Sequence, residues 1–446
     1  MSKLSHAQWS SRLTFILAAT GSAVGLGNIW KFPYMVGDSG GAAFVAVYLL
    51  CIALVGLPIL VAEWLIGRRG QNNPANAMSD LAKGAGQPRI WMLVGVSGIL
   101  GAFLILSFYS VIGGWSLYYT LSSVTGAFSG QDADGINALF TGMLGNPGLL
   151  LIGHSIFMLL VIGIVARGVT KGLEGAVRTL MPALGVLLLV LVGYGMTTGH
   201  FGEAVGFMFN LDFGKLDGGV VLAAMGQAFF TLSLGMGIMM AYGSYLGQEV
   251  NLLKTARTVI ILDTLVALVA GLAIFPIVFA NGLDLSSGPG LIFVTLPLAF
   301  GNMGGGIILG LMFFLLLTFA ALTSAISLLE PVVEFVEERT PLSRVGATLV
   351  AGVATWALGI SALLAFNVWS DVLIFGFNVF DFLDTLTSKY LLPLTGLMAI
   401  VFVAWVLDRD SVRRELGFGD TGAMIWTIVS RFVAPIGVIA VFVSSL

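Results

Sequence analysis

Residues 21–33 read Gly21-Ser22-Ala23-Val24-Gly25-Leu26-Gly27-Asn28-Ile29-Trp30-Lys31-Phe32-Pro33 and lie inside the first long apolar stretch of the chain. The three glycines and the proline make a poor helix interior, because glycine costs about 1 kcal/mol and proline about 3 kcal/mol relative to alanine. Lipid cannot satisfy the backbone groups that a break leaves free, so protein or a polar cavity must surround it. Free carbonyls can then bind a cation, and the N-terminus of the resuming helix can receive a carboxylate. The stretch therefore predicts a binding site within a membrane-spanning helix.

The composition is that of a multi-spanning membrane protein. Of 446 residues, 58% are hydrophobic and only 10% are charged, and the mean hydropathy is +1.01. Soluble proteins carry about 25% charged residues. The single cysteine, Cys51, excludes an intrachain disulfide. The N-terminus has no small-residue cleavage site before the broken stretch, so we expect no removable signal peptide.

Runs of about 20 apolar residues predict about eleven spanning helices. They lie near residues 12–36, 42–66, 91–124, 148–166, 176–198, 219–247, 256–281, 304–338, 344–366, 382–407 and 421–444. Basic residues mark cytoplasmic loops, and nearly all of those outside the spans fall on one side, with Lys215 alone in a loop on the other. This pattern predicts a cytoplasmic N-terminus and, with an odd number of spans, a C-terminus outside.

A second break is predicted in the sixth span, where residues 226–237 contain Gln227, Thr231, Ser233 and a closing Gly235-Met236-Gly237. Two breaks five spans apart suggest a duplication within one transporter domain, 1–446. Residues 12–198 would form the first repeat and 219–407 an inverted second repeat, with 421–444 outside both. Paired interrupted helices indicate the substrate site of a secondary transporter. The alternative, glycines that serve close helix packing, explains one break more readily than two in register.

Four segments together resemble the neurotransmitter:sodium symporter family in its bacterial amino-acid branch: Gly21–Pro33, Gln227–Gly237, Phe319–Ile326 and Glu63–Arg68. The resemblance covers almost the whole chain. It implies an all-α integral membrane protein with the LeuT-like fold, a 5+5 inverted repeat with broken helices 1 and 6, and a place in the bacterial inner (plasma) membrane. It further implies amino-acid symport by alternating access, with two co-transported Na+ ions, no other cofactor, no enzyme activity and no nucleic-acid partner, in a monomer or weak homodimer.

The resemblance implies two sodium sites. The first would use the Ala23 carbonyl, Asn28, Thr231, Asp263 and the substrate carboxylate, which couples the two fluxes. The second would use the carbonyls of Gly21, Val24 and Ala320 and the hydroxyls of Thr323 and Ser324. From the residues alone, these two hydroxyls could equally bond back to the preceding helical turn.

Asp263 is an ionisable residue inside a span, which is a functional-site hypothesis by default. Animal members of the family usually need chloride near the first sodium, and a carboxylate at this position would supply the negative charge instead. We therefore expect chloride independence, with proton antiport allowed on the return step. Tyr48, Gln227 and Ala267 match the other chloride-site positions, and Ala267 lacks a hydroxyl. The alternative places Asp263 near the inner interface, solvated.

The resemblance also implies a substrate site in which backbone amides and the Tyr109 hydroxyl hold the carboxylate and an apolar subpocket holds the side chain. Its residues are Ala23, Gly25, Gly27, Ile105, Tyr109, Phe230, Thr231, Ser233, Met236, Ser324 and Leu328. The apolar lining favours a neutral amino acid with a hydrophobic or aromatic side chain. Glycine, alanine, taurine and GABA stay open as alternatives.

Two gates are expected by the same resemblance. The outer gate would comprise Lys31, Asp384, Tyr109 and Phe230, with Asp381 as an alternative partner of Lys31. Lysine is a point charge without the bidentate fork of the arginine that this family usually has there, so we expect a weaker gate. The inner gate would comprise His6, Trp9, Tyr245 and Glu338, while Glu63 and Glu330 are expected to be structural buried acids.

Two functions from other classes compete with this interpretation. A membrane enzyme would need a catalytic cluster at membrane depth, and the three histidines, His6, His154 and His200, show no metal-ligand spacing. A sodium-permeable channel stays open as an alternative, because one fold can host several functions.

Overall fold

The computed structural model describes residues 8–283 and 290–444, and in these residues the only strands are those of one short hairpin. Within the described residues, nine helical stretches are long and apolar enough to span a membrane: Ala42–Gly70, Arg89–Val124, Pro147–Val165, Val169–Thr197, Leu252–Ala280, Gly306–Arg339, Arg344–Leu364, Val379–Val406 and Asp420–Ala440. A tenth is the pair Arg12–Ala23 and Gly27–Asp38, which is bent by 51° at the predicted first break. The sixth predicted span is also present, as two short helices either side of the second break.

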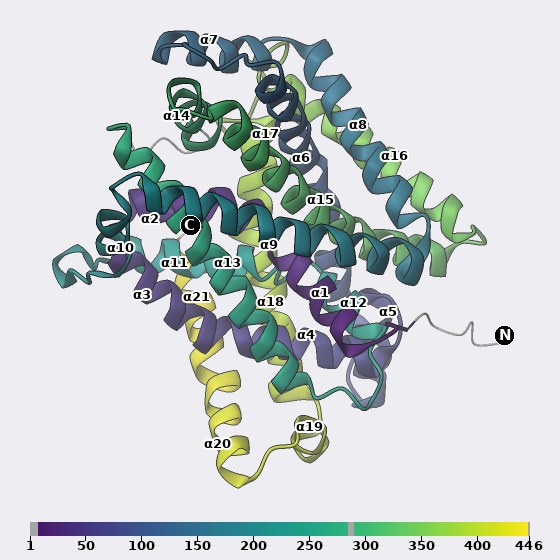
Figure 1. The fold of residues 1–446 in the computed structure, drawn as a ribbon. Coiled ribbons are helices and arrows are strands. Elements are labelled where there is room, and N and C mark those ends of the chain that lie inside the picture. Colours follow the sequence, from purple (N-terminus) through teal and green to yellow (C-terminus); the bar gives the residue numbers. More distant parts are fainter. Residues whose placement is uncertain (1–7, 284–289, 445–446) are drawn as a thin grey trace.

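The labels of Figure 1 follow the chain. The spanning helices are α1 (Arg12–Ala23) and α2 (Phe32–Asp38), α3 (Ala42–Cys51) and α4 (Leu57–Gly70), α6 (Met92–Val124), α8 (Pro147–Val165), α9 (Glu174–Thr197), α11 (Gly218–Thr231) and α12 (Ile238–Ser244), α13 (Leu252–Ala280), α15 (Gly306–Arg339), α16 (Arg344–Leu364), α17 (Val379–Thr385) and α18 (Leu392–Val401), and α20 (Asp420–Ile428) and α21 (Ala434–Ser444). Between them lie α5 (Pro74–Gly84), α7 (Ala133–Leu144), α10 (Phe201–Phe209), α14 (Leu296–Asn302), α19 (Arg409–Leu416) and the hairpin of β1 (Leu373–Ile374) and β2 (Phe377–Asn378).

Three spans and the shorter helix Leu291–Asn302 contain a widened π-helical turn at a position that the sequence explains. The turns η1 (Gly27–Lys31), η2 (Ile52–Gly56), η6 (Leu291–Thr295) and η7 (Leu386–Leu391) each end shortly before a proline at the start of the next helix: Pro33, Pro58, Pro297 and Pro393. Proline has no N–H to donate and its ring clashes with the carbonyl four residues back. A widened turn accommodates both effects without ending the span.

Two groups of helices pack against each other. α6, α8, α15 and α16 lie side by side in the upper right of Figure 1. The second group contains α1, α4, α12 and α13, in which α4 and α12 approach closely because Gly67 and Gly243 face the partner backbone. A Cβ on Gly67 would lie 1.9 Å from the Met240 carbonyl, and one on Gly243 2.7 Å from the Trp64 carbonyl. The broken helices therefore face α6 and α15 where the two groups meet.

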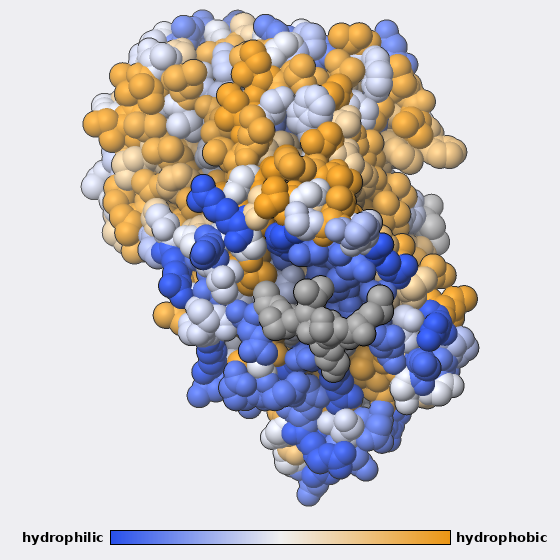
Figure 2. Space-filling view, turned by 90° about the vertical axis from the view of Figure 1, so that its right-hand side faces the viewer, coloured by the Kyte–Doolittle hydropathy of each residue, from blue (hydrophilic) through white to orange (hydrophobic). Residues whose placement is uncertain are grey.

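The surface is divided as expected for a membrane protein. Figure 2 shows hydrophobic residues over the upper half of one face and hydrophilic residues over the lower half, the end of the molecule where α19 and α20 lie. Leu159, Leu189 and Ile308 are among the large apolar side chains that are more than half exposed. Such exposure is favourable only where lipid, not water, is the solvent.

The structure corrects one span boundary and adds helices that hydropathy does not show. The helix predicted to start at residue 176 starts at Val169, with a π-helical turn η4 (Val169–Leu173) that includes Lys171 and Gly172. Polar and glycine residues in this turn lower its hydropathy without ending the helix. The bounds of the two repeats, 12–198 and 219–407, stay a prediction.

Candidate functional site

The first break separates α1 from the turn η1. α1 ends at Ala23, and Val24 is extended with ψ 97°. Gly25 then approaches α6 and α15 closely, since a Cβ there would lie 2.2 Å from Ser324 Oγ and 3.0 Å from the Tyr109 hydroxyl. The absence of a side chain at position 25 therefore creates the room around these two hydroxyls.

The second break lies between α11 and α12 and uses left-handed backbone. Ser233, Gly235 and Gly237 have φ of 53°, 75° and 69°. Glycine adopts this region freely, whereas a serine there is uncommon and strained. The Gly235 N–H donates to Glu63 Oε1 at 2.8 Å, which confirms that Glu63 is a buried acid that supports the break.

Ser22 joins the two breaks to α15. Its carbonyl accepts from Ser233 Oγ at 3.0 Å and from Ser324 Oγ at 3.1 Å. Sequence reasoning did not select Ser22 as a site residue, because a carbonyl is available at every position. Its place between glycines in a broken helix is the only sequence signal for this role.

Three of the four protein groups predicted for the first sodium site lie in contact with one another: Asn28, Thr231 and Asp263. Asn28 Nδ2 donates to Asp263 Oδ1 at 2.8 Å and to the Asp263 carbonyl at 3.1 Å, and the Thr231 hydroxyl lies 3.1 Å from Asp263 Oδ2. All three side chains are fully buried. Asp263 is therefore not solvated at the inner interface, and the alternative based on that position is wrong. Tyr48 and Gln227, the neighbouring positions, are also buried, and Gln227 Nε2 donates to the Gly27 carbonyl at 2.7 Å.

The groups predicted for the second sodium site meet in part. The Thr323 hydroxyl bonds back to the preceding turn of α15, to the Ala320 carbonyl at 3.0 Å and the Phe319 carbonyl at 3.2 Å, as the alternative predicts, and it lies 3.5 Å from the Val24 carbonyl. Ser324 bonds instead to the Ser22 carbonyl. These oxygens come from the first break and from α15. Gly21, the remaining predicted ligand, packs with its Cα towards Met181 of α9. Hard oxygen donors suit Na+, and the set contains carbonyls and hydroxyls only.

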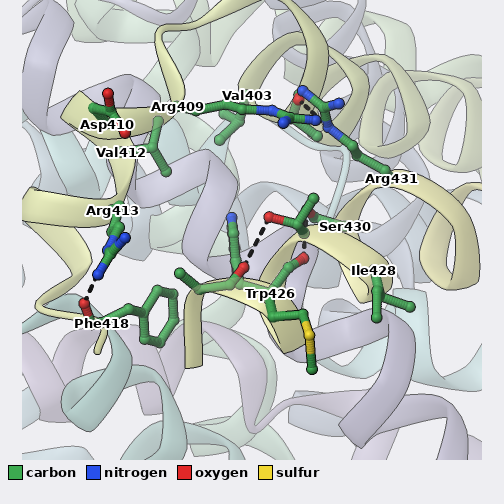
Figure 3. A pocket seen from close by; sticks show the side chains of 14 residues that line it. Val403, Arg409, Asp410, Val412, Arg413, Phe418, Trp426, Ile428, Ser430 and Arg431 are labelled. Carbon is green, nitrogen blue, oxygen red and sulfur yellow. Dashed lines mark hydrogen bonds between the residues drawn. The ribbon is translucent and has the colours of Figure 1, made fainter. Parts of the chain in front are cut away.

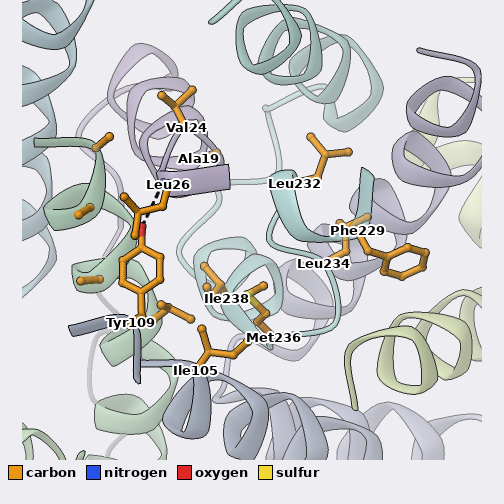
Figure 4. Packing of buried hydrophobic residues seen from close by; sticks show 14 of the residues in the cluster. Ala19, Val24, Leu26, Ile105, Tyr109, Phe229, Leu232, Leu234, Met236 and Ile238 are labelled. Carbon is orange, nitrogen blue, oxygen red and sulfur yellow. Dashed lines mark hydrogen bonds between the residues drawn. The ribbon is translucent and has the colours of Figure 1, made fainter. Parts of the chain in front are cut away.

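A small cavity lies between the two breaks, α6 and α15, with a volume of about 20 Å³, which is room for about one water molecule. It is lined by Ser22, Ala23, Gly25, Leu26, Gly27, Ile105, Tyr109, Phe230, Ser233, Met236, Ser324 and Leu328. The structure thus brings together every residue predicted for the substrate site except Thr231, which lies behind the lining at Asp263, and adds Ser22 and Leu26. Figure 4 shows Tyr109 pointing towards the first break, where its hydroxyl accepts from the Leu26 N–H at 3.3 Å.

The cavity has a polar end and an apolar end. The Tyr109 and Ser324 hydroxyls lie at Gly25, whereas Ile105, Met236 and Leu328 form an apolar part of the wall and are almost fully buried. Figure 4 shows Ile105 and Met236 close together on the side away from Val24. The described lining contains no charged side chain. The lining therefore presents polar groups at one end and apolar groups at the other.

The outer gate differs from the expected ion pair. Lys31 Nζ lies over the Phe230 ring, 4.3 Å from its centroid. Asp384 accepts from Ser388 Oγ at 2.9 Å, and Asp381 accepts from Asn378 Nδ2 at 2.8 Å. Within residues 8–283 and 290–444, Lys31 pairs with neither acid. Lys31 therefore contacts Phe230, a lining residue of the cavity, through a cation–π interaction.

An aromatic cluster contains two of the residues predicted for the inner gate, Trp9 and Tyr245. Trp9 Nε1 donates to the Tyr242 carbonyl at 3.1 Å, and the Trp9 ring packs against Tyr242 and Tyr245. The Tyr245 hydroxyl donates to Glu330 Oε1 at 2.8 Å, and Glu330 also pairs with Arg344. Glu330 is thus a buried structural acid, as predicted, and belongs to the network that Tyr245 forms.

Among the described residues, Glu338 contacts the start of α5. It accepts from the backbone N–H and the side-chain amide of Asn73, at the start of α5. Glu334, one helical turn earlier on α15, accepts from Ser244 Oγ at 3.1 Å and so lies closer to Tyr245. The assignment of Glu338 to the inner gate stays a prediction, because its expected partner is His6. His6 lies outside the described residues.

The chain is similar to known proteins along its whole length. The model of the family described as "Sodium:neurotransmitter symporter family" matches residues 6–135 and 134–446. The chain is 38% identical over 449 residues to the sodium-dependent transporter YhdH of Bacillus subtilis, covering 100% of this chain and 98% of that protein. It is 35% identical to a sodium-dependent transporter of Haemophilus influenzae, covering 98% of each.

One solved structure is similar along the whole chain. The crystal structure of MhsT in complex with L-phenylalanine superposes with a TM-score of 0.91 at 46% identity and covers 99% of this chain and 100% of that chain. The two proteins therefore share one fold.

Proposed function

Because the chain belongs to the sodium:neurotransmitter symporter family, we propose that it couples Na+ entry to uptake of a neutral L-amino acid with a hydrophobic or aromatic side chain. The observation that carries this proposal is the divided cavity. Gly25, Tyr109 and Ser324 offer polar groups at one end, and Ile105, Met236 and Leu328 offer an apolar wall. The similarity to MhsT, solved with L-phenylalanine, supports a large apolar side chain.

The polar end would hold the substrate carboxylate, with the Tyr109 hydroxyl and the amides of the first break as donors. The ammonium group would then reach the carbonyls of the second break. A carboxylate placed near Asn28 and Thr231 can serve as a ligand of the first Na+. Substrate and Na+ then stabilise each other by a shared contact, which is the physical basis of coupling.

The charge balance of the first sodium site supports chloride independence. Asp263 lies in contact with Asn28 and Thr231 and is fully buried, so it can supply the negative charge that a bound chloride would otherwise supply. A buried carboxylate without its cation is costly in a membrane. Protonation of Asp263 after Na+ release would remove that cost, which makes proton antiport on the return step part of the proposal.

Transport would follow alternating access, with the cavity opening in turn to each side. Lys31 over Phe230 would close the outer side, and Trp9 against Tyr242 and Tyr245 would close the inner side. The chain is a multi-pass membrane protein. We further propose a bacterial plasma membrane location, with the N-terminus cytoplasmic and the C-terminus outside, and inverted repeats at 12–198 and 219–407.

Uptake into proteoliposomes tests the proposal. With an inward Na+ gradient, we expect radiolabelled L-phenylalanine or another large neutral amino acid to accumulate above its equilibrium level, and the accumulation to collapse when K+ replaces Na+ or the gradient is abolished. Competition by the twenty amino acids, taurine and GABA then defines the substrate class. Accumulation of glycine, taurine or GABA alone would reject the apolar-substrate proposal. Steady Na+ flux without any amino acid would instead indicate a channel.

A further inference from the structure

A second pocket lies far from the cavity along the sequence, where α19 meets the last two spans. It is formed by the turn η8 (Phe402–Val406), α19, α20 and the turn η9 (Val429–Val433), and has a volume of about 300 Å³. Three of its lining residues are arginines, Arg409, Arg413 and Arg431, and one is an acid, Asp410. Figure 3 shows Arg409 and Arg431 directed into the same part of the pocket.

Arg431 is an unusual residue for its position. It lies in the turn η9 of the last span, about 16 Å along the helix from Asp420 at 1.5 Å per residue. A basic residue inside a span is costly and indicates a partner. Its Nε donates to the Ala404 carbonyl at 2.8 Å, and its guanidinium lies 4.7 Å from the Trp405 ring. These contacts hold the side chain but supply no negative charge.

The nearby acids do not neutralise Arg409 and Arg431. In the described part of the chain, neither Arg409 nor Arg431 lies within ion-pair distance of a carboxylate. Arg413 pairs with Asp420, and Glu415 on the other face of α19 pairs with Arg68 and Arg69. Asp410 lines the pocket without pairing with either. The pocket thus carries an excess of positive charge that suits an anion.

The surroundings identify the source of that anion as lipid. Met424 and Ile428 line the pocket and are 58% and 47% exposed, and the adjacent Trp405 and Phe432 are 53% and 51% exposed. A free phosphate would gain nothing from this apolar surface, whereas acyl chains would cover it. Basic residues at the ends of spans attract anionic headgroups, and the loop that carries α19 is predicted to be cytoplasmic.

We propose that this pocket binds an anionic phospholipid, with the headgroup phosphate between Arg409 and Arg431 and the acyl chains along Met424, Ile428 and Phe432. Arg413 borders the headgroup region from α19. The other face of α19 is tied to α4 through Glu415, Arg68 and Arg69, so the bound lipid would brace the end of α4, which carries Glu63.

Tryptophan quenching by lipids with brominated acyl chains tests this site on the purified full-length chain in detergent. Trp405 and Trp426 lie at the pocket, and a Trp426→Phe variant identifies the part of Trp426 in the signal of the nine tryptophans. We expect brominated phosphatidylglycerol to quench at a lower concentration than brominated phosphatidylcholine. Equal quenching by the two lipids would overturn the proposal.

Charge variants locate the headgroup. Arg409→Gln should raise the phosphatidylglycerol concentration for half-maximal quenching about fivefold, the typical contribution of one basic residue at an anionic surface. Arg414→Gln removes an exposed arginine of the same helix outside the pocket and should leave that concentration unchanged. Equal effects of the two variants would overturn the site. Inorganic phosphate should not displace the lipid at millimolar concentration; displacement would assign the site to a free anion and reject the lipid.

Discussion

The side-chain amide of Asn28 donates to the carboxylate of Asp263 over 2.8 Å and so joins the first break to α13 inside the membrane. A carbonyl-rich break, an amide and a fully buried carboxylate form one polar cluster with Thr231. A cation offsets the burial of this carboxylate better than hydrogen bonds alone. We therefore expect Asp263 to determine how transport depends on Na+ and chloride.

We expect uptake by the native protein to be unchanged when gluconate replaces chloride, because Asp263 supplies the negative charge. Asp263→Asn removes that charge at nearly constant shape and should lower apparent Na+ affinity at least about tenfold, which corresponds to about 1.4 kcal/mol. The measurement is the Na+ concentration for half-maximal uptake. Asp371→Asn, at an exposed loop position, is the matched control. A several-fold rise of native uptake on adding chloride would contradict the prediction.

The second prediction concerns the space at Gly25. Gly25→Ala places a methyl group 2.2 Å from Ser324 Oγ and 3.0 Å from the Tyr109 hydroxyl, so it should abolish substrate binding. Gly226→Ala is the matched control, because nothing lies within 4 Å of a Cβ there. The increase in melting temperature on adding amino acid measures substrate binding in both variants, since binding stabilises the folded protein. A ligand-induced shift retained in Gly25→Ala would show that the cavity is not the substrate site.

How far the sequence predicts this site depends on what each role requires. Glycines and polar residues in apolar stretches locate both breaks, and an intramembrane aspartate is conspicuous, so Gly25, Asn28 and Asp263 are accessible to sequence reasoning. The Ser22 carbonyl is not, because backbone acceptors carry no residue signature. The sequence also does not show which hydrogen-bond partner a charged side chain takes. Ser388 lies one turn from Asp384 on the same span, and Asn73 lies at a helix start opposite Glu338; short-range geometry decides both pairings.

The inner side gives a third prediction. Trp9→Ala removes the ring contacts with Phe15, Tyr242 and Tyr245 and the hydrogen bond to the Tyr242 carbonyl. The conformation with a closed inner side should become less populated. If that conformation binds substrate, the apparent substrate affinity falls in proportion to its population. Binding of radiolabelled substrate to the purified protein measures that loss. Trp369→Ala, at a tryptophan that is 38% exposed, should leave the affinity unchanged. Equal affinities for native protein and Trp9→Ala would contradict a closing role for Trp9.

The outer side gives the last prediction, which separates two models of its gate. If Lys31 closes the cavity through Phe230, Lys31→Gln should speed substrate release about two- to fivefold, since a cation–π contact at a partly exposed site contributes about 0.5–1 kcal/mol. Phe230→Leu should have a similar effect and remove the additional effect of Lys31→Gln in the double variant. Asp384→Asn should change the release rate little, because Asp384 bonds to Ser388. Release is measured by dilution of bound radiolabelled amino acid. If Asp384→Asn speeds release as much as Lys31→Gln, and the effects of the two are not additive, then the ion pair and not the aromatic contact holds the outer side closed.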